Sequence, residues 1–322
     1  MTPPDTDARR DTGIGAGSAP APGTGGPADQ PPAGAPTGDP VRITQPVAPG
    51  PYAGPVAGLP PQSGLTTDTA VFTNAYAVIP RTVMRDIVTS YLPGWTGMRM
   101  WMIARPLSGF AETFSQYIVE LAEGGGCDTP EDDPEVQSAL FVTGGDLDVT
   151  IDGQTHNLHP GGFAYIPPGA AWSVRNATPG NCGFHWWRKR WQPAAGIGKP
   201  DVIVVQEQDV APSPMPDTDG AWATTRFMDP ADLRHDMHIT IVTFLPGGTI
   251  PFAETHVMEH GLFVLEGKAV YRLNRDWIEV GPGDFMWLRA FCPQACYAGG
   301  PGRFRYLLYK DVNRHAPLWR NG

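Results

Sequence analysis

The chain has 322 residues, of which 39 are Gly and 36 are Pro, and hydrophobic residues make up 41% of it. So many helix breakers exclude a protein built mainly from long helices, and the hydrophobic fraction excludes a wholly disordered chain. The formal net charge of −10 argues against general affinity for nucleic acid or an anionic membrane. We therefore expect short strands and turns, with no nucleic-acid partner and no membrane partner.

The first 64 residues differ in composition from the rest. They contain 15 Pro, 12 Gly and 10 Ala, and Tyr52 is their only aromatic residue. Such a segment cannot bury enough apolar surface to offset the entropy lost on ordering. We predict a disordered tail over residues 1–64.

Cysteine usage and the N-terminus indicate the compartment. The four cysteines form no CxxC pair, which is typical of reduced thiols in a cytosolic protein. The N-terminus has no apolar leader, and no apolar run is long enough to span a membrane. We expect a cytoplasmic protein.

Strand patterns dominate residues 65–322. Short, partly alternating apolar runs are separated by Gly, Pro, Asp or Asn. They cover residues 114–122, 138–144, 147–152, 162–169, 238–248, 261–267, 269–274, 284–291 and 304–310. This spacing predicts an all-β chain folded as antiparallel sandwiches or barrels.

An internal repeat divides the β region. Residues 140–166 align without a gap on residues 262–288, at a shift of 122 positions. Seven positions are identical, and the apolar alternation of the two blocks also agrees. The repeat predicts an N-terminal module over residues 65–193, a linker over 194–225 and a C-terminal module over 226–322.

The turn residues of the first module resemble a known family. Residues 161–176 read G-x5-P-x-G-x2-W-x3-N. This resembles the second conserved motif of the cupins, small double-stranded β-helix barrels. Cupins place a metal-binding His where this chain has Trp172, and the second module has Gln294 at the equivalent position. The resemblance implies two tandem cupin barrels behind a disordered N-terminal tail.

The second module retains the spacing of the first cupin motif with the ligand types permuted. The candidate ligands are Glu254, His256, His260 and Gln294. Two imidazoles, a carboxylate and an amide oxygen suit a divalent metal ion that keeps positions open for substrate or water. The first module has Asp132, Pro134, Ser138 and Trp172 at the corresponding positions, and Pro and Trp cannot bind a metal. We expect metal ligands in the second module and none in the first.

Residues 256–260 also match a second motif. They read H-x-x-E-H, an inverted zincin signature that requires both His side chains on one face of a helix. The preceding PGGTIP and the following Gly261 argue against a long helix there. The cupin interpretation is favoured over the protease interpretation.

A closer resemblance covers roughly residues 70–315. Residues 76–88, 188–193, 254–285 and 305–314, together with Gln294, resemble the (S)-ureidoglycine aminohydrolase family of purine (allantoin) degradation. Membership would imply a hydrolase acting on C–N bonds in linear amidines. Its reaction is the manganese-dependent conversion of (S)-ureidoglycine to (S)-ureidoglycolate and ammonia.

The resemblance also implies roles for residues. Glu254, His256, His260 and Gln294 would bind Mn²⁺, whereas Lys310, Tyr271 and Tyr306 would approach the substrate as catalytic residues. Lys310 could protonate the departing ammonia or hold the substrate carboxylate, and the sequence leaves both roles open. The donor set leaves Fe²⁺, Zn²⁺ and Ni²⁺ open as alternatives to Mn²⁺.

Partners and alternatives follow from the same residues. We expect a small anionic substrate, and the family implies a homo-oligomer. A cupin dioxygenase or isomerase acting on another small carboxylate is the alternative enzyme class, and a metabolite-binding bicupin without catalysis is the non-enzymatic one. Cys292 and Cys296 flank Gln294 and could approach the metal or simply pack in the core.

Overall fold

The computed structural model describes residues 51–54, 69–84, 91–106, 110–311 and 314, all of which belong to the unit Pro40–Gly322. The predicted tail lies outside the described residues except for 51–54. The described residues form strands and two short 3-10 helices, with no α-helix among them, which confirms the all-β prediction. No helix in this part of the chain is long and apolar enough to cross a membrane.

The elements up to the end of the first repeat are β1 (Val71–Phe72), β2 (Tyr76–Ile79), η1 (Arg81–Val83), β3 (Trp95–Ala104), β4 (Ser115–Cys127), β5 (Val136–Gly144), β6 (Leu147–Ile151), β7 (Gln154–Leu158), β8 (Gly162–Ile166), β9 (Trp172–Asn176) and β10 (Cys182–Arg190). Those that follow are β11 (Ile203–Gln206), η3 (Glu207–Asp209), β12 (Ser213–Pro214), β13 (Trp222–Arg226), β14 (Met237–Phe244), β15 (Thr249–Glu254), β16 (His260–Glu266), β17 (Ala269–Leu273), β18 (Asp276–Val280), β19 (Phe285–Leu288), β20 (Gln294–Tyr297) and β21 (Phe304–Asp311).

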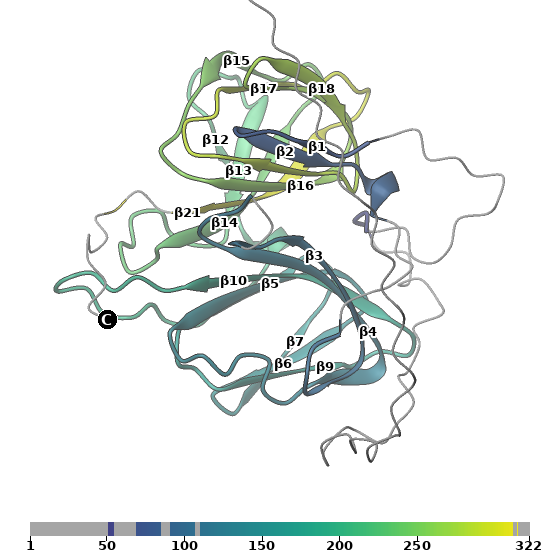
Figure 1. The fold of residues 1–322 in the computed structure, drawn as a ribbon, viewed down its shortest axis with the longest axis vertical. Helices are drawn as coiled ribbons and strands as arrows, with labels where there is room; N and C mark the ends of the chain where they lie inside the picture. Colours follow the sequence, from purple (N-terminus) through teal and green to yellow (C-terminus); the bar gives the residue numbers. More distant parts are fainter. Residues whose placement is uncertain (1–50, 55–68, 85–90, 107–109, 312–313, 315–322) are drawn as a thin grey trace, which may run out of the picture. The chain divides into compact units, whose positions relative to one another are not determined.

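The first barrel is a single folded sheet. Its strand order is β11-β8-β5-β10-β4-β9-β6-β7, and β3 also pairs with β4. The long strand β4 joins the two walls, because most of it pairs with β10 while Gly126 and Cys127 at its end pair with β9. Figure 1 shows these strands wrapping around one interior.

The second barrel has the same plan in two sheets. One sheet has the order β1-β2-β19-β16-β21-β14-β13-β12, and the other has the order β15-β20-β17-β18. A turn over residues 245–248 separates β14 from β15, where the first barrel has the continuous strand β4. The predicted fold of two tandem cupin-type barrels is therefore confirmed.

The internal repeat is visible strand by strand. β6 and β17, and likewise β7 and β18, begin and end at positions 122 residues apart. The turn preceding β8 has Gly161 at φ 89°, and its counterpart Gly283 has φ 91°. Both values lie in the left-handed region that favours glycine, so the shared turn explains the shared residue.

The two barrels exchange edge strands. β2 precedes the first barrel in the chain but pairs with β19 of the second, and β11 precedes the second barrel but pairs with β8 of the first. β8 and β19 are equivalent strands, so each exchanged strand covers the same exposed edge. Tyr76 and Val78 of β2 pack inside the second barrel, although the predicted boundaries assign them to the N-terminal module.

Residues 51–54, which lie within the predicted tail of residues 1–64, contact the folded part. The Tyr52 ring meets Phe141 edge-on at 5.3 Å, and its hydroxyl donates a hydrogen bond to Glu207. Glu207 in turn accepts a hydrogen bond from Arg305. The apolar ring and the shared carboxylate explain why this part of the Pro-rich segment packs against the barrels.

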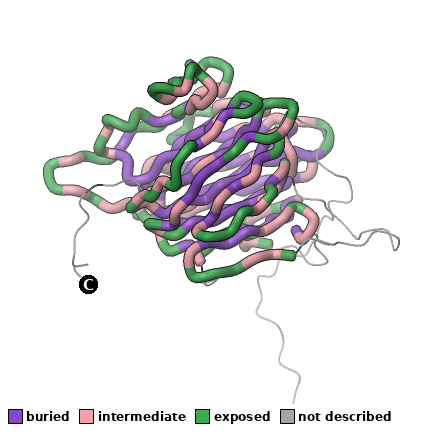
Figure 2. The backbone as a smooth tube through the Cα atoms, turned by 90° about the horizontal axis from the view of Figure 1, so that it is seen from above, coloured by how far each residue is buried: buried purple, intermediate pink, exposed green. Residues whose placement is uncertain are grey.

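Three apolar clusters organise the interior. One fills the first barrel, one fills the second, and the third lies between them and contains residues from both. On β21, Leu307 and Tyr309 face the shared cluster, whereas Phe304 and Tyr306 face the second barrel's interior. Strand alternation thus gives β21 one face toward the other barrel and one face toward its own barrel's interior. Figure 2 shows that buried residues run along the strands, whereas the connecting loops are mostly exposed or intermediate.

A buried ion pair crosses the same junction. Lys189 Nζ on β10 lies 2.7 Å from the Asp236 carboxylate, just before β14, and both side chains are almost fully buried. The other Asp236 oxygen accepts a hydrogen bond from Gln137. These contacts satisfy the charges and hold the start of β14 against the first barrel.

Candidate functional site

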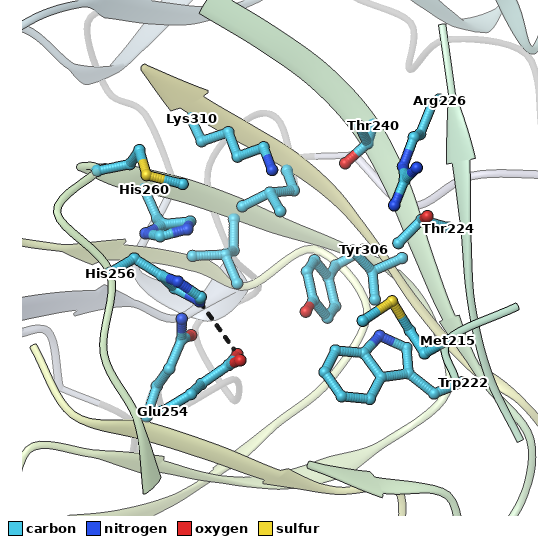
Figure 3. Close-up of a pocket in the computed structure, with 15 residues that line it drawn as sticks. Met215, Trp222, Thr224, Arg226, Thr240, Glu254, His256, His260, Tyr306 and Lys310 are labelled. Atoms are coloured by element: carbon cyan, nitrogen blue, oxygen red, sulfur yellow. Dashed lines mark ion pairs between the residues drawn. The ribbon is translucent and has the colours of Figure 1, made fainter. Parts of the chain in front are cut away.

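A cavity of about 160 Å³ opens inside the second barrel (Figure 3). The strands β13, β14, β16 and β21 each contribute residues from one face only, because alternate side chains point the same way. These residues are Trp222, Thr224, Arg226, Thr240, Val242, His260, Leu262, Tyr306, Leu308 and Lys310. The cavity is smaller than the roughly 300–1,000 Å³ typical of drug-sized ligand sites, so a small metabolite fits it best.

The four predicted metal ligands all line this cavity. Glu254 ends β15 and lies opposite Gln294 of β20 in the strand register. His256 Nε2 lies 3.3 Å from Glu254 Oε1, and the rings of His256 and His260 are 5.2 Å apart. Side chains from two strands of one sheet, one strand of the other and the β15–β16 loop therefore converge.

His260 is held in the protonation state that a metal ligand needs. Burial, together with the neighbouring His256 and Lys310, lowers the pKa of His260 to about 3. The imidazole is therefore neutral at physiological pH, with a ring nitrogen able to donate a lone pair.

The donor set fits a divalent ion by its chemistry. The described residues contain no group of three or more His, Cys, Asp or Glu side chains already spaced to hold one. The Glu254 carboxylate nevertheless touches His256, and the neutral His260 and the amide of Gln294 line the same cavity. Carboxylate, imidazole and amide oxygen are ligand types shared by sites for Mn²⁺, Fe²⁺ and Zn²⁺.

Two of the three predicted catalytic residues reach the cavity. Tyr306 and Lys310 line it, whereas Tyr271 is fully buried behind it. The Tyr271 hydroxyl donates a hydrogen bond of 3.4 Å to Gln294 Oε1 and lies 3.2 Å from the Tyr306 hydroxyl. Tyr271 therefore supports Gln294 and Tyr306 and does not line the substrate space.

The hydroxyls of Tyr271 and Tyr306 and the amine of Lys310 are proton-bearing groups in or directly behind the cavity. Burial raises the pKa values of Tyr271 and Tyr306 well above 10, so both hydroxyls stay protonated and can donate hydrogen bonds. Lys310 lies beside His260 in the strand register. Burial lowers the pKa of Lys310, the charge of Arg226 lowers it further, and Glu254 opposes both effects.

The corresponding space in the first barrel is filled with aromatic side chains. Trp172 occupies the position of Gln294, and Trp186 occupies that of Leu308. Their rings meet edge-on at 5.9 Å, and Tyr117 packs against Trp186 at 5.2 Å. These indoles occupy the interior that is a polar cavity in the other barrel.

Glu259 stands outside the cavity, which rules out the protease interpretation. Residues 255–259 are a loop and not a helix. The Glu259 carboxylate accepts hydrogen bonds from the backbone N–H groups of Glu112 and Thr113, the Thr113 hydroxyl and the Trp287 indole, at 2.6–2.9 Å. A carboxylate that accepts hydrogen bonds from four donors is not free to act as a base. It anchors residues 255–259, called the ligand loop here because they include His256, to the first barrel.

The cysteines beside Gln294 belong to the core. Cys292 and Cys296 are both buried in the second barrel's apolar cluster, and neither lines the cavity. Burial raises the pKa of each thiol, which keeps it protonated and a poor metal ligand.

The sequence pattern does not predict one wall of the cavity. Trp222, Thr224 and Arg226 lie on β13, where the prediction placed the end of a linker and the first residue of the module. The alternation in WATTR is a strand signal, but the segment is only five residues long. Its partner β14 follows after a loop, so the pairing could not be foreseen from local pattern alone.

A model of the Cupin domain family matches the chain over residues 117–188 and 240–309. These ranges cover most of the strands from β4 to β10 and from β14 to β21, that is, both barrels.

Named relatives match across both barrels. The chain is 30% identical over 233 residues to the (S)-ureidoglycine aminohydrolase of Escherichia coli (strain K12), covering 72% of this chain and 87% of that protein. It is 31% identical over 232 residues to the (S)-ureidoglycine aminohydrolase of Arabidopsis thaliana, covering 71% of this chain and 74% of that protein. The crystal structure of a candidate glyoxylate-induced protein from Pseudomonas aeruginosa matches with a TM-score of 0.77 and 65% identity, covering 84% of this chain and 99% of that chain.

Proposed function

Because the chain belongs to the (S)-ureidoglycine aminohydrolase family, we propose that it hydrolyses (S)-ureidoglycine to (S)-ureidoglycolate and ammonia, using a divalent metal ion in its second barrel. The observation that carries this proposal is the convergence of Glu254, His256, His260 and Gln294 on one small cavity that also contains Lys310 and Tyr306.

The charges of the cavity support a small anionic substrate. Lys310 and Arg226 both line it, and Glu254 is the one acidic residue among the described residues of its lining. A divalent ion bound by Glu254 would leave the site net positive, although the whole chain carries −10. An anion of the size of an amino acid would then be attracted into a cavity of about 160 Å³.

The four ligands would hold the ion, and we propose Mn²⁺ for it because the family implies manganese. When bound, such an ion supplies a Lewis acid that polarises a substrate oxygen and lowers the pKa of water. The neutral His260 and the His256–Glu254 pair hold the ligand atoms near the cavity, and Tyr271 orients the Gln294 amide.

The remaining side chains bind and orient the substrate. The protonated Tyr306 hydroxyl and the Lys310 ammonium can each donate a hydrogen bond to a substrate oxygen or nitrogen. The leucines Leu262 and Leu308 form an apolar floor that limits water at the reacting carbon. Fixing three substituents of one carbon on different walls makes attack stereospecific.

The test is ammonia release from freshly prepared ureidoglycine. Protein loaded with Mn²⁺ should release ammonia faster than the spontaneous reaction and give the S product. A rate equal to the spontaneous one in a metal-replete sample would contradict the proposal. Oxygen uptake without ammonia release would favour a cupin dioxygenase.

The wider setting is also a proposal. The family resemblance supports a role in purine (allantoin) degradation, a cytoplasmic location and a homo-oligomeric state. Size measurement of the purified protein in solution tests the last of these directly.

A further inference from the structure

β13 presents three polar side chains to the cavity, Trp222, Thr224 and Arg226. The indole Nε1 of Trp222 and the hydroxyl of Thr224 are buried and lack a hydrogen-bond partner among the described residues. Buried polar groups are nearly always paired, since an unpaired one costs about 1–3 kcal/mol. Both residues line the cavity, so a bound ligand can supply the missing partners.

Arg226 follows on the same face of the same strand. Its guanidinium is directed into the cavity beside Thr224 (Figure 3). Neither Arg226 nor Lys310 forms an ion pair with any carboxylate that the structure describes, and the two cations are close enough for Arg226 to lower the pKa of Lys310. An anion bound at Arg226 would relieve this repulsion.

The three groups face the ligand set across the cavity. β13 is separated from β21 by β14, and Thr224, Val242 and Tyr306 form one row of the sheet. Glu254, His256 and Gln294 come from the other sheet and its loop. A small molecule held near the ligand set therefore presents its remaining substituents to β13.

We propose that β13 determines substrate specificity: Arg226 binds the substrate carboxylate, while Thr224 Oγ1 and Trp222 Nε1 bind its ureido group. This inference rests on the proposed function and names the residues that select its substrate. An arginine fork matches a carboxylate, and a donor beside a hydroxyl matches the C=O and NH₂ of a ureido group. The amine and the reacting carbon would then point toward the metal ligands.

The experiment measures binding by calorimetry with metal-loaded protein and three stable probes that lack the reacting amine. N-carbamoylglycine has both the ureido group and the carboxylate. N-carbamoylglycinamide lacks the carboxylate, and N-acetylglycine lacks the terminal NH₂. Because the probes are not turned over, the readout is independent of catalysis.

Arg226→Met should weaken N-carbamoylglycine binding at least about tenfold and leave N-carbamoylglycinamide nearly unchanged, as expected for a lost hydrogen bond to a charged group. Thr224→Val should abolish the preference for N-carbamoylglycine over N-acetylglycine. Arg303→Met is the matched control: it removes the same charge from an exposed arginine that pairs with Glu266 outside the cavity.

The outcomes separate this inference from the proposed function. If the wild type hydrolyses ureidoglycine but Arg226→Met and Thr224→Val bind all three probes as it does, the β13 assignment is wrong and the activity stands. If the metal-loaded wild type neither binds N-carbamoylglycine nor hydrolyses ureidoglycine, both proposals are overturned.

Discussion

Gln294 and Trp172 begin equivalent strands of the two barrels, 122 residues apart, and have opposite surroundings. Gln294 lines a cavity and accepts a hydrogen bond from Tyr271. Trp172 packs edge-on against Trp186 in an apolar interior. The same position of the duplicated barrel thus lies in the candidate site of one barrel and in the packed core of the other.

The first prediction tests this division. Trp172→Ala should lower the free energy of unfolding by about 3–5 kcal/mol, because it leaves a cavity among large apolar side chains. It should leave the metal content of the folded protein unchanged. Urea unfolding and elemental analysis check the two statements.

Gln294→Leu is the matched change in the other barrel. It should reduce metal content while costing much less stability than Trp172→Ala, since it removes a ligand without emptying a packed core. Loss of metal in Trp172→Ala, or full metal content in Gln294→Leu, would contradict the division.

The second prediction concerns the anchor of the ligand loop. Glu259→Ala leaves three donors on residues 112–113 and the Trp287 indole without their acceptor. Stability should fall by about 3–5 kcal/mol, because several buried or half-buried neutral donors lose their acceptor at about 1–3 kcal/mol each. Chemical unfolding measures this loss.

Glu279→Ala provides the control. Glu279 pairs with Lys268 on the surface, where both side chains are mostly exposed. Such pairs contribute only about 0–1 kcal/mol, so this variant should unfold almost like the wild type. Equal losses in the two variants would refute the anchoring role of Glu259.

The third prediction concerns acid stability. His185 is buried between Trp187 and Phe263 at the barrel junction, and burial lowers its pKa to about 3. Between pH 6.5 and 3 the unfolded chain binds a proton that the folded chain excludes. Stability is therefore fully present above pH 6.5 and falls on acidification, by about 1.4 kcal/mol per pH unit for this one group.

His185→Phe should make the fall with pH shallower by this one-proton slope. Unfolding in urea at pH 6.5, 5.5 and 4.5 measures both slopes. If the wild type and His185→Phe lose the same stability per pH unit, burial of neutral His185 is not the cause of the acid sensitivity.

The fourth prediction concerns the residue behind Gln294. Tyr271→Phe removes the hydroxyl that donates to Gln294 Oε1 while keeping the ring. The metal dissociation constant should rise by about tenfold, the lower range for loss of a group that orients a ligand. Competition with a chelator measures it. The control is Tyr297→Phe, which changes an exposed tyrosine at the end of β20, the strand of Gln294, and should bind metal as the wild type does.

Much of this architecture could be predicted because its signals are local or repeated. The 122-residue shift read from the sequence places β6 on β17 and β7 on β18, as the structure does. The spacing of Glu254, His256 and His260 identified one side of the cavity, since a motif retains spacing even when ligand types change. Lys310 and Tyr306 came from the family resemblance and do line the cavity.

What escaped prediction depends on contacts between distant segments. β2 pairs with β19 and β11 pairs with β8, so each pairing joins residues far apart in the chain. The hydrophobic periodicity of a short strand does not indicate which sheet edge it will cover. Arg226 belongs to no recognisable motif. Its place opposite the candidate metal ligands follows only from the pairing of β13 with β14. Glu259 lies in the disfavoured H-x-x-E-H motif, and nothing in that motif indicates its actual partners on residues 112–113 and Trp287.

The most direct test of the central claim is the metal content per chain of the wild type and of His256→Ala, measured by elemental analysis after loading and desalting. We predict one equivalent of metal in the wild type and little in the variant, because the four proposed ligands all lie in the second barrel. Two equivalents in the wild type, or equal content in both proteins, would contradict it.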